Sequence, residues 1–129
     1  MALRFFTGSL SVLFAACLLM TSAWAHHGWN WADSDQIKLT GIVKSVSMVP
    51  PHPRLEVETP NDGVWRIELA NPAQTKRAGF IEGSAKPGDS VKVTGNRSKD
   101  HSEKRMKAVQ ITVGDKTYDI YPDRILAGQ

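Results

Sequence analysis

The side chains of this chain best suited to bind a metal ion are its four histidines, His26, His27, His52 and His101. The first two directly follow Ala23-Trp24-Ala25, in which the two alanines supply the small-x-small pattern that a signal peptidase recognises. Cleavage after Ala25 would make His26 the first residue. Its free α-amine and its imidazole could then chelate one metal ion.

A third candidate nitrogen ligand is His52, which lies in the run Pro50-Pro51-His52-Pro53. Proline fixes its own backbone φ angle, so we expect this loop to hold the imidazole in place. Imidazole and amine nitrogens in a tetragonal arrangement favour Cu(II). The sequence therefore predicts a metal-binding protein, with copper as the expected ion, His26 and His52 as ligands, and His27 as an alternate ligand.

The same histidines have a second interpretation, as ordinary surface residues. His26 and His27 would then be no more than neighbours of the cleavage site, in a chain terminus that frays. His52 would form a hydrogen bond inside a turn, and His101 would belong to a solvated, charged loop. Both interpretations are compatible with the sequence.

Residues 1–25 have the three parts of an export signal. Arg4 is basic, an apolar run extends from Phe5 to Met20, and the cleavage pattern comes next. The run is shorter than the ~20 residues needed to span a bilayer. We therefore expect a periplasmic protein, cleaved after Ala25 and without a membrane anchor. A lipid-anchored protein cut before Cys17 is the alternative, but Phe14-Ala15-Ala16 matches a lipobox poorly and the apolar run continues past the cysteine.

Composition excludes several other classes of site. Cys17 is the only cysteine, so the processed chain would have no thiol for a disulfide or a thiolate metal site. The formal net charge of +3 is too small to indicate a nucleic-acid partner. The chain has no nucleophile elbow, phosphate-binding loop or HExxH motif. We therefore predict no enzymatic activity.

Alternation of apolar and polar residues predicts short β-strands along most of the processed chain. A strand begins at Ile37, and a shift of its phase predicts a bulge between Gly41 and Lys44. Arg54 to Leu69 reads as a hairpin around the turn Pro60-Asn61-Asp62-Gly63. Further strands are expected at Val91–Gly95, Met106–Val113 and Thr117–Tyr121, with a charged loop from Asn96 to Arg105.

One helix is expected, from about Pro72 to Ala78, because Asn71 can cap its start and Gly79 can end it. A helix between the third and fourth strands is typical of the oligonucleotide/oligosaccharide-binding (OB) fold. We therefore predict an all-β fold with one short helix, a five- to six-stranded OB-like barrel. A small β-sandwich is the alternative. The expected boundaries are a signal peptide at 1–25, an arm at 26–36, the barrel at 37–121 and a tail at 122–129.

Trp29 and Trp31 come shortly after the paired histidines and have two interpretations. Exposed, they would form a stacking surface for a small ligand or a periplasmic protein, and the chain would be a non-catalytic binding module. Buried, they would fasten the arm to the barrel. Packing is the preferred interpretation because large aromatic residues dominate the energetics of protein cores.

Several short motifs recur in a known group of proteins. They are Ala25-His26-His27, Leu39-Thr40-Gly41-Ile42-Val43, the Pro51-His52 step, and Lys86-Pro87-Gly88-Asp89 leading into Val91. In these motifs the chain resembles a family of small exported bacterial proteins whose domain has no assigned function. Family members usually have Asn-Pro-His where this chain has Pro50-Pro51-His52. The resemblance implies export and a barrel-like fold, and it implies no activity.

Overall fold

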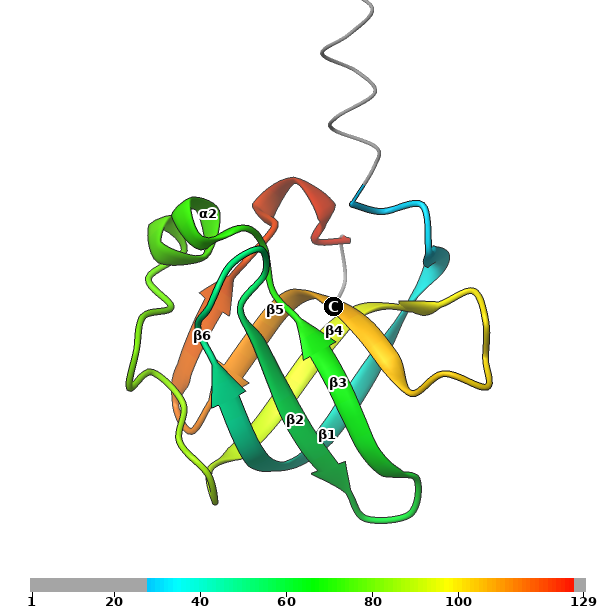
Figure 1. The fold of residues 1–129 in the computed structure, drawn as a ribbon, viewed down its shortest axis with the longest axis horizontal. Helices are drawn as coiled ribbons and strands as arrows, with labels where there is room; N and C mark the ends of the chain where they lie inside the picture. The colour runs from blue at the N-terminus through cyan, green and yellow to red at the C-terminus, as the bar shows by residue number, and fades with distance from the viewer. Residues whose placement is uncertain (1–27, 127–129) are drawn as a thin grey trace, which may run out of the picture. The chain divides into compact units, whose positions relative to one another are not determined.

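The computed structural model describes residues 28–126. The elements of the fold belong to the unit that starts at Trp31 (Figure 1). These elements are β1 (Ala32–Ser47), β2 (Arg54–Thr59), β3 (Gly63–Glu68), α2 (Pro72–Arg77), β4 (Ser90–Ser98), β5 (Arg105–Val113), β6 (Lys116–Asp119) and the 3₁₀ turn η1 (Pro122–Arg124).

The six strands form one sheet in the order β3-β2-β1-β4-β5-β6, with an additional pairing between β3 and β5. That pairing is parallel and joins Arg66–Glu68 to Arg105–Lys107, so it closes five strands into a ring. The all-β, OB-like architecture with one short helix is therefore confirmed. The β-sandwich alternative is wrong, because the described strands make one closed sheet and not two stacked sheets.

Strand β1 belongs to both halves of the ring. It pairs with β4 as far as Ile42 and with β2 from the same residue onward. At this crossing a Cβ atom on Gly41 would lie 2.3 Å from the carbonyl oxygen of Glu58, so only glycine allows the strands to approach. The register shifts between Val43 and Ser45, which confirms the predicted bulge.

Strand β1 begins at Ala32 and not at Ile37, where the alternation begins. The reason is a side chain of β4. The Nδ2 atom of Asn96 donates hydrogen bonds to the carbonyl oxygens of Asp33 and Ser34, at 2.9 and 3.2 Å. An amide side chain thus spans a stretch where the strand register shifts. Pairing with the start of β1, where Ala32 lies opposite Ser98, likewise extends β4 to Ser98, into the segment expected to be a loop.

The predicted helix forms at Pro72–Arg77, with the side chain of Asn71 accepting a hydrogen bond from the backbone N–H of Gln74. Gly79 comes after the helix with a φ of 88°, in the left-handed region that favours glycine. The chain then turns inward, and the ring of Phe80 is fully buried in edge-to-face contact with Tyr118. This contact packs the segment that follows helix α2 against strand β6.

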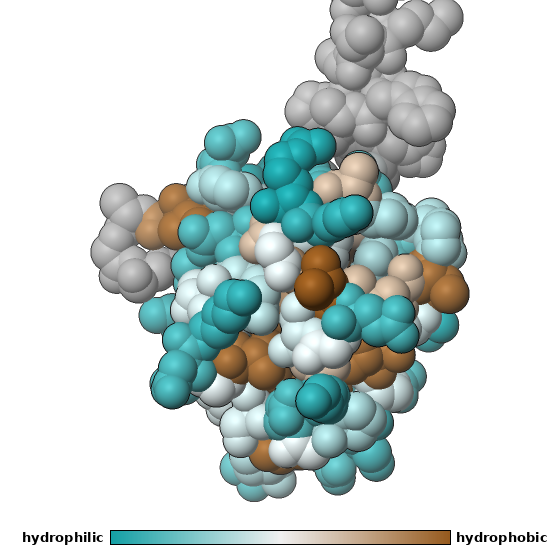
Figure 2. All heavy atoms as spheres, turned by 90° about the vertical axis from the view of Figure 1, so that its left-hand side faces the viewer, coloured by the Kyte–Doolittle hydropathy of each residue, from teal (hydrophilic) through white to brown (hydrophobic). Residues whose placement is uncertain are grey.

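The core lies inside the ring of strands. It contains inward-facing residues from every strand together with the residues around α2, among them Val43, Leu55, Val57, Ile67, Leu69, Phe80, Val93, Met106 and Ile111. On the face drawn in Figure 2, hydrophobic residues form separate small spots among polar ones. Between residues 28 and 126, no helix has the length and apolar character needed to cross a bilayer.

Candidate functional site

His52 lies in the loop that joins β1 to β2, between Pro51 and Pro53. The loop is tied to the end of β3, because the backbone N–H of Leu69 donates to the carbonyl oxygen of Pro53 at 2.8 Å. The imidazole is half-buried. Its Nδ1 atom is buried and has no hydrogen-bond partner. The Nδ1 atom of His52 therefore makes no hydrogen bond within the turn.

The other predicted ligands, His26 and His27, lie outside the described residues. Within residues 28–126, no three His, Cys, Asp or Glu side chains gather closely enough to hold a metal ion.

His101 already has a partner. Its Nε2 atom lies 3.2 Å from a carboxylate oxygen of Asp33 at the start of β1. The hydrogen bond from His101, together with one from the backbone of Ser34, lowers the pKa of the Asp33 carboxyl. The backbone oxygen of His101 accepts a hydrogen bond from the guanidinium of Arg97 at 3.0 Å. His101 is exposed, as predicted, but it serves to fasten its loop to β1.

Trp31 lies against the guanidinium of Arg105, which is 3.7 Å from the centre of the indole ring. Arg105 in turn donates to both carboxylate oxygens of Glu68, at 2.9 and 3.0 Å through one nitrogen. Glu68 and Arg105 belong to the β3–β5 pairing that closes the sheet, so these contacts join Trp31 to that pairing. This face of Trp31 thus packs against Arg105 and does not form a surface on which a ligand could stack.

Lys107 is buried beside this pairing, with 1% of its surface exposed, and it is in register with Glu68. Burial lowers the pKa of Lys107, and the carboxylate of Glu68 opposes that effect. The Lys107 ammonium lies 5.8 Å from the ring of Tyr121, and burial raises the pKa of Tyr121 to about 12. Sequence reasoning missed this cluster because no local pattern marks a lysine that tertiary contacts will bury.

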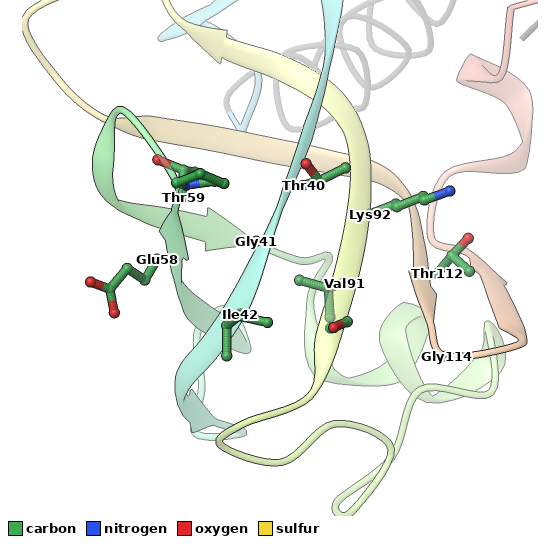
Figure 3. A pocket seen from close by; sticks show the side chains of 11 residues that line it. Thr40, Gly41, Ile42, Glu58, Thr59, Val91, Lys92, Thr112 and Gly114 are labelled. Carbon is green, nitrogen blue, oxygen red and sulfur yellow. The ribbon is translucent and has the colours of Figure 1, made fainter.

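An open groove of about 620 Å³ crosses the outer face of the sheet where β1 passes from β4 to β2 (Figure 3). Thr40, Gly41 and Ile42 form its middle, Glu58 lies on the β2 side, and Lys92 lies on the β4 side. The carboxylate of Glu58 is 3.6 Å from the ammonium of Lys44. The sequence did not single out this groove, because its residues occupy outward positions of ordinary alternating strands.

Residues 15–108 match the family described as "Family of unknown function (DUF6152)". No curated protein sequence matches the chain.

Solved structures with a similar fold have very different sequences. A TiaS mutant that lacks its ZRD, in complex with agmatine, has a TM-score of 0.51 and 18% identity over 66% of this chain and 26% of its own. The mitochondrial single-stranded DNA binding protein Rim1 of S. cerevisiae has a TM-score of 0.50 and 11% identity over 64% of this chain and 95% of its own. The S. pombe Stn1–Ten1 complex has a TM-score of 0.49 and 20% identity over 63% of this chain and 59% of its own. At such identities the likeness shows the OB-type fold alone.

Proposed function

This chain belongs to the DUF6152 family of unknown function, and from that premise we propose that it is an exported, non-catalytic protein that binds copper through its processed N-terminal histidine. Family membership supplies the domain and no activity. The proposal therefore depends on the chemistry of the residues themselves.

The observation that carries the proposal is the imidazole of His52. Its Nδ1 atom is buried and has no hydrogen-bond partner. A neutral imidazole has one nitrogen with a free lone pair, and a metal ion can use it where no N–H donor does. The proline-rich loop reduces the entropy that the ring loses on binding an ion. In this proposal His52 supplies one nitrogen donor, and because Nδ1 is buried, the ion would bind at Nε2 or displace the atoms that cover Nδ1.

The remaining donors in the proposal come from the sequence. Export and cleavage after Ala25 would give His26 a free α-amine next to its imidazole, and His27 would be the alternate ligand. Amine and imidazole nitrogens are the donors that Cu(II) favours, and the processed chain would contain no thiolate to favour another metal. In this proposal the protein is located in the periplasm. Export also creates the metal chelate, because signal cleavage frees the α-amine of His26.

The test is a Cu(II) titration followed by calorimetry and electron paramagnetic resonance. Two chains are compared, both starting at His26, one with a free α-amine and one with that amine acetylated. We expect the acetylated chain to bind Cu(II) at least about tenfold more weakly, because it lacks the α-amine on His26. Equal, weak binding by both chains would show that His26 is an ordinary surface residue and would overturn the proposal.

A second pair of variants tests His52 in the same assay. His52→Ala should weaken Cu(II) binding at least about tenfold and remove the signal of one nitrogen ligand from the resonance spectrum. His101→Ala is the matched control, since the ring of His101 is already engaged with Asp33. The same affinity for His52→Ala as for the native chain would remove His52 from the ligand set.

A further inference from the structure

We propose that the outer face of β1, β4 and β5 binds an acidic polysaccharide. The site is the β4 side of the open groove over β1, and none of its residues belongs to the metal proposal. The two proposals can therefore fail independently.

The strand register brings two lysines together on this face. Lys38 pairs with Thr94 and Thr40 pairs with Lys92 across β1 and β4, so the two lysines occupy diagonal positions. Diagonal neighbours on one face of an antiparallel pair lie roughly 7–8 Å apart. Both ammonium groups can therefore reach one extended anionic chain.

The groove continues beyond Lys92. A second open hollow, of about 350 Å³, shares Thr40, Lys92 and Thr112 with the first and extends to Lys38. In Figure 3 the side chain of Lys92 extends from β4 towards Thr112 on β5, and Thr40 lies on the other side of β4. Together the hollows extend across three strands, with the exposed side chain of Ile42 in the first and polar side chains around Lys92.

The positive charge of this surface is not neutralised by the protein. Within residues 28–126, no carboxylate forms an ion pair with Lys38 or Lys92. Glu58 lines the groove, but it pairs with Lys44 and in Figure 3 its carboxylate points away from Lys92. Asp119, across from Gln110, accepts a hydrogen bond from that amide at 2.8 Å. The two lysines are thus available to an external anion.

The other groups on this surface favour a sugar as the carrier of the negative charge. Thr40, Thr94 and Thr112 line the same hollow as the lysines. The hydroxyl of Thr112 is already hydrogen-bonded to that of Thr117, at 2.9 Å, and those of Thr40 and Thr94 can donate to and accept from the hydroxyls and carboxylates of acidic sugars. No aromatic side chain lines either hollow, so the bases of a single-stranded nucleic acid would have no ring on which to stack. The two hollows are open and share residues across three strands, which suits a polymer better than a compact ion.

The experiment uses polygalacturonate as the probe and measures its binding by calorimetry at low salt, with neutral dextran and polyphosphate as comparison polymers. We expect binding of polygalacturonate, no binding of dextran, and weaker binding of polyphosphate, which lacks hydroxyl groups. Lys38→Gln and Lys92→Gln should each weaken binding about fivefold. Lys86→Gln removes the same charge from an exposed turn and should leave the affinity unchanged, as should His52→Ala.

Three outcomes would overturn the proposal. They are no binding of polygalacturonate by the native protein, an equal loss in Lys86→Gln and Lys92→Gln, and polyphosphate binding as tight as that of polygalacturonate. The second would indicate attraction by net charge alone, and the third an unselective anion surface.

Discussion

The ion pair at the ring closure makes Glu68→Gln the most informative change in stability. The substitution keeps the size of the side chain and removes its charge. In the native protein, one nitrogen of Arg105 donates to both carboxylate oxygens of Glu68, and Lys107 faces the same carboxylate from a position that is 1% exposed. Two cations would then share a largely buried site, with Glu103, 4.0 Å from Arg105, as the remaining carboxylate.

The expected cost follows from the exposure of the pair. Removing one partner of a buried ion pair costs roughly 3–5 kcal/mol, because the other charge stays desolvated. The side chain of Glu68 is 13% exposed and that of Arg105 is 29% exposed, so solvent screens part of the effect. We therefore expect the lower end, about 3 kcal/mol of the unfolding free energy at neutral pH. Urea denaturation followed by tryptophan fluorescence measures this difference.

Because Lys107 titrates, the unfolding free energy of the native protein and of Glu68→Gln should depend differently on pH. Burial lowers its pKa in the folded protein below the ordinary 10.5. Between the lowered value and 10.5 the unfolded chain binds more protons, so the unfolding free energy rises with pH in that interval. In Glu68→Gln the carboxylate no longer opposes the effect of burial. The rise should therefore begin at lower pH and be larger than in the native protein.

The control is Lys107→Met, which removes the buried ammonium and should abolish the rise. In the double variant, Glu68→Gln should cost less than it does alone, because Lys107 is no longer left without its anion. A loss below about 1 kcal/mol, the value typical of exposed pairs, would refute the reasoning. An unchanged pH profile in Glu68→Gln would refute it as well.

The remaining predictions concern packing and titration. Gly95→Ala should lower the unfolding free energy, measured by urea denaturation, by about 3 kcal/mol, since its Cβ would lie 2.1 Å from the carbonyl oxygen of Lys107. The control Gly114→Asn, in an open turn, should change the unfolding free energy little. Phe80→Ala should cost about 3–5 kcal/mol, because the ring is fully buried, and a calorimetric melting temperature close to that of the native protein would contradict its place in the core. Because the pKa of Tyr121 is raised to about 12, stability should fall as pH rises from about 10 to 12. Tyr121→Phe should remove that fall in urea denaturation, and an unchanged fall would contradict the prediction.

The parts of the fold that the sequence predicted are those with local signals. The hairpin turn at Gly63, the capped helix after Asn71 and the bulge before Ser45 each depend on residues a few positions apart. The side-chain hydrogen bonds of Asn96 to the start of β1 span 63 and 62 positions, and no periodicity records them.

In the candidate site, too, the sequence identified only the residues that a local pattern marks. His52 was singled out by its neighbouring prolines, and its unpartnered nitrogen became visible only in three dimensions. The surface around Lys92 was not found, because strand alternation identifies an outward lysine but not its neighbours on the adjacent strands. Ligand roles for His26 and His27 stay predictions, since both residues lie outside 28–126.

The short pairing between β3 and β5 also bears on how the chain folds. Only three residue pairs close the ring, and the partners Glu68 and Arg105 lie 37 positions apart. Joining such distant segments costs more chain entropy than forming the neighbouring hairpin, so this step should come late in folding. The same contact is where partial opening in the native state would begin, with the amides of β3 exchanging hydrogen sooner than those of the central strands.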